Sequence, residues 1–310
     1  LNCSHTGVKY RTRISAPSTA VLGAFYDETY KGDGLKIAEV INNSPLDVID
    51  RQVKAGHIIK QIDHQPITAG QDYFPMLTGK VGKRVLLTIA DDKGKEYEIT
   101  IKPISYGTQY ELLYDRWIEQ RAKTVEQATN GQVGYIHIKS MDSHSFRKTY
   151  SELLGKYRNC KSIIIDERHN GGGWLHNDLA ILLSGRHYMT FESRGQQLGI
   201  EPFTQWTKPS CLMITENCYS NANGFPYTYK TLGIGKLIGA PMAGTMTAVW
   251  WEPIADGRLT LGIPEIYCLD NNGRPLENHT LYPNIESHNT PEDLTEGYDR
   301  QLMRAIEEMK

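Results

Sequence analysis

The sequence is short of long hydrophobic runs, of charge of one sign and of cysteine, and each shortage excludes a class of protein. No run approaches the roughly 18 apolar residues of a membrane-spanning helix, so we expect no insertion into a membrane. Lysine and arginine number 34 against 36 aspartates and glutamates, which argues against a basic nucleic-acid groove and an acidic tail. Five cysteines in 310 residues, with no Cys-x-x-Cys pair, are too sparse for a disulfide scaffold or a zinc knuckle.

The chain also lacks the glycine patterns that hold nucleotides and the clusters that hold metals. No Gly-Lys-Ser/Thr follows the glycines at 171–173, and the spacing Gly-x-Gly-x-x-Gly is absent. His169 and His176 have no third or fourth ligand at a suitable spacing, so we expect them to flank a cleft. We therefore predict no metal and no organic cofactor. Leu1–His5 is polar and carries no secretory signal, and because the chain does not begin with Met we expect residues upstream of it.

A length of 310 residues suggests about two domains, and the first of them is rich in strands. Residues 35–40 alternate polar and apolar side chains, as a half-buried strand does, and two strands flank the turn at Asp92–Gly94. The order of elements over 20–104, with the stretch at 56–67, resembles a PDZ domain. Such domains bind extended peptides at a sheet edge, and the resemblance puts the carboxylate-binding loop at Val21, Leu22, Gly23 and Ala24. The alternative is a β-barrel spacer that packs against the rest of the protein.

Strands and helices alternate in the second part of the chain. Continuous apolar runs at 162–166 and 211–215 indicate buried strands, and shorter strands are expected at 134–138 and 237–239. Helical spacing or composition places helices at 110–127, 145–154, 175–183 and 222–232. This alternation predicts an α/β fold around a mixed, largely parallel sheet.

Two turns of this α/β part follow buried strands and lead into helices. Asn170–Gly173 would expose backbone N–H groups, which suit an oxyanion or a phosphate equally well. Ser220 follows the strand at 211–215 and stands at a helix start, where most serines are N-caps. On position alone, a capping hydroxyl is the more common role, and a nucleophile is the alternative.

Four motifs in order resemble the carboxyl-terminal-processing serine peptidases, and among them the tricorn type. They are Ser4-His5, the run from Asp166 to Gly173, the turn at Ser220, and the segment 276–285 around Glu277. The resemblance covers essentially the whole chain. It implies an α/β catalytic domain of the ClpP/crotonase kind over 105–310, a PDZ-like domain over 20–104, and an N-terminal segment, 1–19, that packs on the catalytic domain.

The resemblance also implies a role for each motif residue. Ser220 would be the nucleophile, His5 its general base, and Glu277 and Ser4 the groups that orient the imidazole. Backbone N–H groups of Gly172, Gly173 and Asn221 would form the oxyanion hole. We further expect Asp166 and Arg168 to form a structural ion pair beneath the site, and Glu192 to be a solvated surface residue rather than part of a specificity pocket.

The leading hypothesis is a serine peptidase that cleaves peptides or unfolded proteins. The alternative is a non-catalytic peptide- or ligand-binding module on the same scaffold; the presence of all four motifs argues for the enzyme. The resemblance allows a homo-oligomer. It favours the bacterial periplasm or another extracytoplasmic compartment, with the cytoplasm as the alternative.

Overall fold

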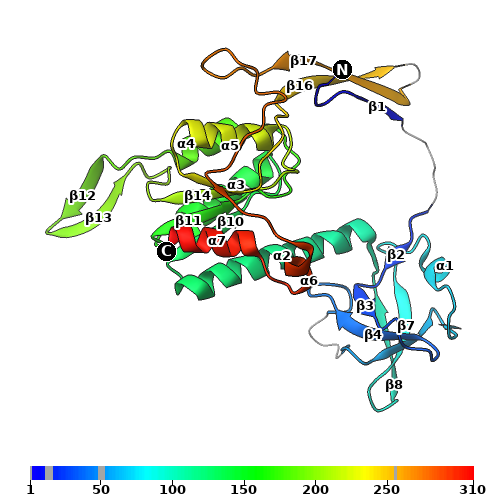
Figure 1. The fold of residues 1–310 in the computed structure, drawn as a ribbon. Coiled ribbons are helices and arrows are strands. Elements are labelled where there is room, and N and C mark those ends of the chain that lie inside the picture. The colour runs from blue at the N-terminus through cyan, green and yellow to red at the C-terminus, as the bar shows by residue number, and fades with distance from the viewer. Residues whose placement is uncertain (1, 11–16, 48–52, 255–256) are drawn as a thin grey trace. The chain divides into compact units, whose positions relative to one another are not determined.

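The computed structural model describes residues 2–10, 17–47, 53–254 and 257–310. Contacts divide the chain into two compact units, which Figure 1 shows in colours that follow the sequence. One unit combines Leu1–Thr12 with Arg121–Lys310, and the other is Arg13–Gln120. We call them the α/β unit and the β-rich unit.

The β-rich unit is built on an antiparallel sheet whose strand order is β3-β4-β5-β7-β8. The predicted hairpin is present, with Val85 opposite Ile101. Its core consists of the buried aliphatic side chains that alternate along these strands. The elements are β2 (Ala20–Val21), β3 (Ala24–Tyr26), β4 (Leu35–Val40), β5 (Ile58–Ile62), β6 (Gln65–Pro66), α1 (Phe74–Leu77), β7 (Val85–Ala90), β8 (Glu96–Ile101) and β9 (Ile104–Ser105).

The α/β unit contains a five-stranded sheet in the order β10-β11-β14-β15-β18, and each neighbouring pair is parallel. The predicted α/β class is therefore confirmed, and the predicted helices and strands are present with ends shifted by a few residues. The strands are β10 (Val133–His137), β11 (Ser162–Asp166), β14 (Ser210–Ile214), β15 (Lys236–Gly239) and β18 (Ile285–Glu286). Helix α2 (Tyr106–Thr129) contains the boundary between the units, at Gln120 and Arg121. The helices that lie wholly in this unit are α3 (Ser143–Ser151) with a π turn at Glu152–Lys156, α4 (His176–Leu183), α5 (Asn221–Thr231), α6 (Pro291–Thr295) and α7 (Arg300–Met309).

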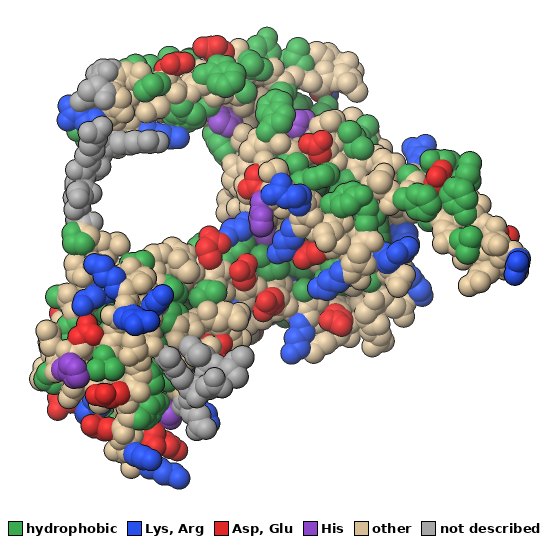
Figure 2. All heavy atoms as spheres, turned by 180° about the vertical axis from the view of Figure 1, so that it is seen from behind, with side chains coloured by type: hydrophobic (Ala, Val, Ile, Leu, Met, Phe, Trp, Pro, Cys, Tyr) green, Lys and Arg blue, Asp and Glu red, His purple; other side chains and the backbone are tan. Residues whose placement is uncertain are grey.

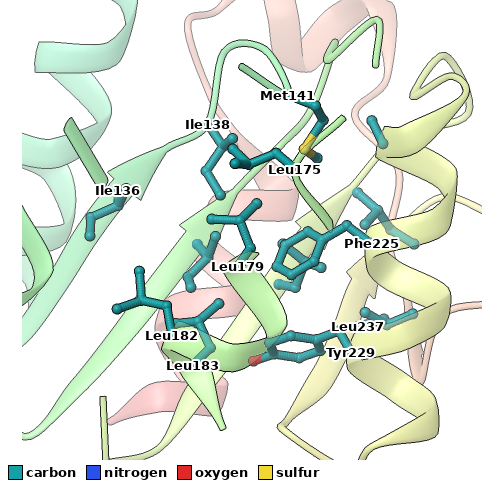
Figure 3. Packing of buried hydrophobic residues seen from close by; sticks show 14 of the residues in the cluster. Ile136, Ile138, Met141, Leu175, Leu179, Leu182, Leu183, Phe225, Tyr229 and Leu237 are labelled. Carbon is teal, nitrogen blue, oxygen red and sulfur yellow. The ribbon is translucent and has the colours of Figure 1, made fainter. Parts of the chain in front are cut away.

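The main core of this unit lies between one face of the sheet and helices α3, α4 and α5. Ile163 and Ile165 of β11 belong to this core. Leu179 of α4 and Phe225 of α5 lie close to one another in it (Figure 3). Side chains of a strand alternate between its two faces, so Ile164 and Asp166 face the opposite side, where α7 packs on β11 and β14. The carboxyl ends of the strands are thereby fixed by packing on both faces.

Two antiparallel elements of the α/β unit were not expected in detail. A three-stranded sheet in the order β1-β17-β16 joins the chain start to residues 247–267; its strands are β1 (Gly7–Tyr10), β16 (Thr247–Ile254) and β17 (Leu259–Tyr267). A hairpin of β12 (Met189–Ser193) and β13 (Gln196–Glu201) stands off the body, and hydrophobic side chains gather on it (Figure 2).

The composition raised two questions, about membrane-spanning helices and about the state of the cysteines. Among the helices of the described ranges, none combines the length and apolarity that crossing a bilayer requires. All five cysteines carry free thiols.

Candidate active site

Ser220 lies in a strained turn between β14 and α5. Its φ and ψ are 58° and −122°, a left-handed conformation that residues other than glycine rarely adopt outside functional sites. It occupies the N-cap position of α5, but its hydroxyl makes no capping hydrogen bond. The common N-cap role is therefore not the role of this hydroxyl. Instead the Ser220 N–H donates to Thr245 Oγ1 at 3.0 Å, which holds the turn from its backbone.

Glu277, Ser4 and His5 form a continuous relay, although Glu277 and His5 lie 272 positions apart in the sequence. Glu277 Oε2 accepts the Ser4 hydroxyl at 2.9 Å, and its Oε1 accepts the Ser4 N–H at 2.5 Å. Ser4 Oγ lies 2.9 Å from His5 Nδ1. Glu277 is 9% exposed, so its charge acts in a site that water reaches poorly. The carboxylate thus orients the imidazole through the hydroxyl of Ser4.

Thr247, the first residue of β16, completes this relay. Its Oγ1 lies 2.8 Å from Ser4 Oγ and 3.0 Å from His5 Nδ1, and it donates to the Ser4 carbonyl at 3.1 Å. β1 and β16 both run antiparallel to β17, so residues just before β1 and the first residue of β16 lie at the same end of this sheet. Sequence reasoning missed Thr247, since nothing in the run Gly-Thr-Met-Thr marks it.

Burial and charge act on His5 in opposite directions. Partial burial lowers the pKa of the imidazole from its ordinary 6.5, and the nearby Glu277 carboxylate offsets part of this decrease. The net direction is downward, because the loss of hydration is the larger cause. His5 is therefore mainly neutral at neutral pH, the protonation state that a general base needs.

Tyr219 connects His5 with the turn that carries Ser220. The His5 N–H donates to the Tyr219 phenolic oxygen at 2.7 Å, and the two rings lie 4.7 Å apart between centroids. Among the described residues, Ser220 Oγ makes no hydrogen bond, so none joins it to the His5 ring. The structure thus brings Glu277, Ser4 and His5 into contact and places Ser220 next to Tyr219, without a direct bond between serine and imidazole.

The glycine turn packs directly against Ser220. A Cβ added to Gly172, whose φ is +97°, would lie 2.6 Å from the Tyr219 carbonyl and 2.8 Å from Ser220 Cβ. A side chain at Gly173 would meet the Met141 carbonyl at 2.2 Å. At 172, only glycine permits this approach of the two turns, although Ser220 is 48 positions further along the chain, and at 173 only glycine permits the approach to the Met141 backbone.

Three N–H groups were expected to line an oxyanion hole, and the structure distinguishes between them. The Gly172 N–H donates to Asn170 Oδ1 at 2.9 Å. Asn221 opens α5, so its N–H has no acceptor within the helix. The Gly173 N–H likewise finds no acceptor in the described part of the chain. In the described part of the chain, two of the three donors are therefore free, one of them on the residue directly after Ser220, and the third is held by a side chain of its own turn.

Residues 244–247 join the parts of the site. The Gly244 carbonyl accepts the Asn278 N–H at 2.9 Å, next to Glu277. A Cβ on Gly244 would lie 2.2 Å from the Leu276 carbonyl, so the loop that carries Glu277 packs on bare backbone here. Together with the bonds of Thr245 and Thr247, this segment contacts the serine turn, the glutamate loop and the Ser4–His5 pair.

The amide of Asn221 is structural. Its Oδ1 accepts the N–H groups of Leu175 and His176 at 2.7 and 2.9 Å, and its Nδ2 lies 2.7 Å from His176 Nδ1. Asn221 thereby ties the start of α4 to the start of α5. His169, the other histidine of this region, contacts the Asn217 amide at 2.9 Å.

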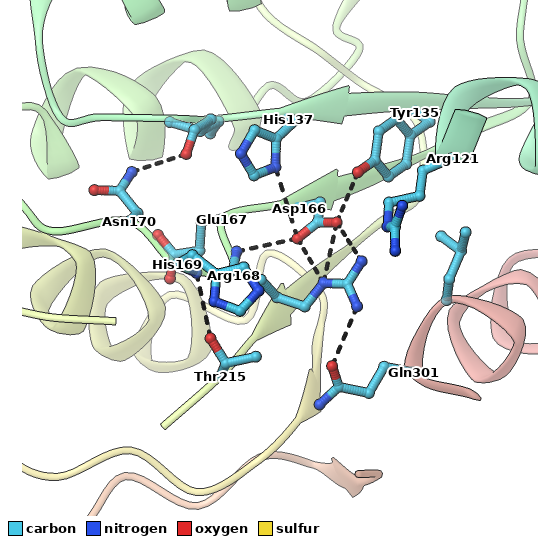
Figure 4. A network of polar contacts seen from close by, with 12 residues as sticks. Arg121, Tyr135, His137, Asp166, Glu167, Arg168, His169, Asn170, Thr215 and Gln301 are labelled. Atoms are coloured by element: carbon cyan, nitrogen blue, oxygen red, sulfur yellow. Dashed lines mark hydrogen bonds and ion pairs between the residues drawn. The ribbon is translucent and has the colours of Figure 1, made fainter. Parts of the chain in front are cut away.

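A buried ionic network lies under the glycine turn (Figure 4). Arg168 and Asp166 form the predicted ion pair, with Arg168 Nη2 at 2.7 Å from Asp166 Oδ2. Arg168 also binds Asp299 at 2.9 Å, and Tyr135 donates to Asp166 at 2.7 Å. The arginine holds the pKa of Asp166 below its ordinary value, although burial opposes it. Glu167 is buried beside them, and its carboxyl group has no hydrogen-bond partner among the residues that the structure describes; burial raises its pKa well above the usual range.

Glu192 and the predicted peptide-binding loop belong to other parts of the chain. Glu192 is exposed on β12, as expected for a surface glutamate. In the β-rich unit, β3 is an edge strand of its sheet. Val21, Leu22 and Ala24 line a pocket of about 520 Å³ there, together with Tyr26 and other side chains near β3 and α1. Gly23 has a φ of +86°, and a side chain on it would meet Ser44.

The α/β unit thus presents, at the carboxyl ends of its parallel strands, an exposed glycine turn, a strained serine and a carboxylate–hydroxyl–imidazole relay. The chain carries these features together with a separate, smaller β-rich unit. Comparison with known families agrees: the sequence matches Peptidase family S41 over residues 132–287 and the Tricorn protease PDZ domain over residues 27–106. The chain belongs to peptidase family S41.

Individual relatives agree with this assignment. The chain is 26% identical over 310 residues to the Tricorn protease of Thermoplasma volcanium, covering 96% of this chain and 29% of the relative. It is 25% identical over 255 residues to the Tricorn protease of Thermoplasma acidophilum, covering 81% of this chain and 23% of the relative. A crystal structure of the tricorn protease superposes with a TM-score of 0.80 at 22% identity, covering 94% of this chain and 29% of that one. The chain therefore spans less than a third of the length of these relatives.

Proposed function

We propose that this chain is a serine endopeptidase that cleaves peptides or unfolded proteins, with Ser220 as nucleophile and His5 as general base. The observation that carries the proposal is the relay from Glu277 through Ser4 to His5 Nδ1, with distances of 2.9 Å at both steps. A relay that orients the imidazole through Nδ1 leaves the other ring nitrogen, Nε2, to exchange protons with a reacting group. Family membership supports the same reaction.

The reaction would proceed in two halves. Ser220 Oγ attacks the peptide carbonyl and forms the new C–O bond, while His5 Nε2 takes the hydroxyl proton. His5 then returns this proton to the departing amine nitrogen as the C–N bond breaks. A water molecule next attacks the acyl group, His5 accepts its proton and returns it to Ser220 Oγ, and the free acid leaves. Glu277 and Ser4 stabilise the imidazolium that forms in each half.

The negative charge that develops on the carbonyl oxygen needs donors. We assign this role to the N–H groups of Asn221 and Gly173, which have no other acceptor among the described residues. Gly172 supports the hole, since its N–H is bound to Asn170 and its lack of a side chain lets the two turns meet. Among the described residues no hydrogen bond joins Ser220 Oγ to the imidazole; catalytic hydrogen bonds of this kind commonly form when substrate aligns the groups.

For the β-rich unit we propose that an extended peptide adds to the free edge of β3. The support is the edge position of this strand and the adjoining pocket, which Val21, Leu22 and Ala24 line. A ligand of this type would pair with the backbone and place alternate side chains in the pocket.

A fluorophosphonate probe tests the catalytic proposal. We expect it to label Ser220 and the chain to hydrolyse reduced, unfolded casein. Ser220→Ala should abolish both, and His5→Gln should abolish hydrolysis while the fold persists. Labelling elsewhere, or full hydrolysis by Ser220→Ala, would overturn the proposal and favour a binding module on the same scaffold.

A further inference from the structure

Three polar atoms of different chain segments meet in a small triangle behind the His5 ring. His5 Nδ1, Ser4 Oγ and Thr247 Oγ1 are separated by 2.9, 2.8 and 3.0 Å. Each distance is that of a hydrogen bond, yet only three hydrogens are available: one on each hydroxyl and one on Nδ1 if that nitrogen is protonated. The direction of each bond follows from counting these hydrogens.

Acceptors outside the triangle decide where two of the three hydrogens go. The Glu277 carboxylate can only accept, so it takes the Ser4 hydroxyl hydrogen at 2.9 Å. The Ser4 carbonyl can also only accept, and it takes the Thr247 hydroxyl hydrogen at 3.1 Å. Both hydroxyl oxygens then face His5 Nδ1 with lone pairs. The Thr247 hydrogen is shared between the Ser4 carbonyl and Ser4 Oγ, which lies 2.8 Å away, so it serves the contact between the two hydroxyls. The two remaining contacts, with His5 Nδ1, are satisfied only if Nδ1 carries a hydrogen that it shares between both oxygens.

We propose that Thr247 is a positioning residue of this site: its hydroxyl, bound to the Ser4 carbonyl, is the second acceptor that keeps the proton of His5 on Nδ1 and leaves Nε2 free as the base. The effect of Thr247 on catalysis rests on the proposed function. Its effect on the tautomer of the His5 ring does not. Thr247 adds a fifth side chain to the four that the sequence motifs indicate, and this one comes from a strand without a motif.

Two features of the surroundings favour this role over a purely structural one. Thr247 is 8% exposed, so little water is present to replace its hydroxyl as an acceptor. Ser4 alone would also be able to turn its hydrogen toward Nδ1, which would then be the acceptor, and the ring would carry its proton on Nε2. With Thr247 present, a ring that is protonated on Nε2 would set the lone pair of Nδ1 against the Thr247 oxygen, which lies 3.0 Å away.

Thr247→Val removes the hydroxyl and keeps the shape, and Thr247→Ser keeps the hydroxyl. We expect Thr247→Val to lower kcat about 10- to 100-fold on unfolded casein, because the charged imidazolium of the transition state loses one hydrogen bond. KM should stay within about twofold, since Thr247 is not placed at the substrate. The acid limb of the kcat/KM profile should move to lower pH, because the imidazolium is less stable. Thr247→Ser should restore kcat.

The ring itself offers a readout that does not require activity. Nitrogen-15 spectra of histidine-labelled protein distinguish the two neutral tautomers, and His5→Gln identifies the signal of His5. We expect the Nδ1–H form in the wild-type chain and in Thr247→Ser. In Thr247→Val the ratio should move about fivefold toward the Nε2–H form, as the loss of one neutral hydrogen bond predicts.

Thr260→Val is the matched control, because Thr260 lies on β17 of the same sheet and its hydroxyl makes no hydrogen bond in the described part of the chain. It should leave kcat and the tautomer unchanged. A wild-type Nε2–H tautomer, or a Thr247→Val variant that is folded and retains the wild-type tautomer ratio, would overturn the inference. If the wild-type chain hydrolyses nothing, the proposed function fails. The nitrogen-15 spectra, which report the tautomer of His5, then decide whether Thr247 positions the proton of the ring.

Discussion

The phenolic oxygen of Tyr219 accepts the backbone N–H of His5 at 2.7 Å, which joins the start of the chain to the residue directly before the serine. The bond lies between two segments that no local motif connects. It fixes the backbone of His5 relative to the turn whose hydroxyl His5 would deprotonate. The position of the proposed base thus depends on a side chain to which we assign no chemical step.

We expect Tyr219→Phe to lower kcat/KM about 2- to 10-fold, because a neutral hydrogen bond of this kind, here partly buried, contributes about 0.5–1.5 kcal/mol. The aromatic contact with the His5 ring, at 4.7 Å between centroids, remains in the variant. Kinetics on unfolded casein measure the change. Tyr150→Phe, on the exposed side of α3, is the control and should behave as wild type. Equal rates for the two variants would show that the bond does not position His5.

The pH dependence follows from the environment of His5. Burial lowers the pKa of the imidazole below 6.5, so the acid limb of kcat/KM should have its midpoint below this value and activity should be full at neutral pH. Glu277 raises the same pKa, so Glu277→Gln should move the limb further toward acid and lower kcat at every pH. A limb that moves to higher pH in Glu277→Gln would show that this carboxylate does not act on His5.

Gly172 and Gly171 provide a matched pair for the glycine turn. Gly172→Ala would place a methyl group 2.8 Å from Ser220 Cβ at a φ of +97°, whereas a Cβ on Gly171 meets nothing within 4 Å. We expect Gly172→Ala to reduce kcat about 100-fold, comparable with the loss of one oxyanion donor, and Gly171→Ala to keep wild-type rates. Fluorophosphonate labelling and casein hydrolysis measure both. Similar losses in the two variants would mean that the turn tolerates no side chain for reasons unrelated to Ser220.

The sequence was sufficient to predict the parallel sheet, because the signals of its strands are local. The roles of the motif residues came from the resemblance to a peptidase family, since position alone favoured an N-cap for Ser220. The apolar runs at 162–166 and 211–215 can only be buried, and they lead directly into the glycine and serine turns. Thr247 and Tyr219 could not be predicted, since their roles depend on which strands meet at one end of the β1–β17–β16 sheet. Hairpin β12–β13 could not be predicted either. It is largely exposed, so its strands need no alternation of polar and apolar residues that would mark them in the sequence.

The ion pair of Asp166 and Arg168 should be among the largest contributions of polar groups to stability. Asp166→Ala leaves the buried Arg168 without its main partner, and we expect a loss of about 3–5 kcal/mol in the free energy of unfolding. Glu307→Gln, which breaks an exposed pair with Arg304 at 3.6 Å, is the control and should change stability by less than about 1 kcal/mol. Urea unfolding at neutral pH measures both.

The same pair predicts how stability depends on acid. The pKa of Asp166 is lower in the folded chain than in the unfolded chain, so its contribution is complete above the unfolded value and is lost as pH falls through the folded value. The stability of the wild-type chain should therefore decrease more steeply with acidification than that of Asp166→Ala. If the free energy of unfolding changed with pH at the same slope in both chains, the pKa of Asp166 would be the same in the folded and unfolded states. Arg168 would then not stabilise the charged form of Asp166.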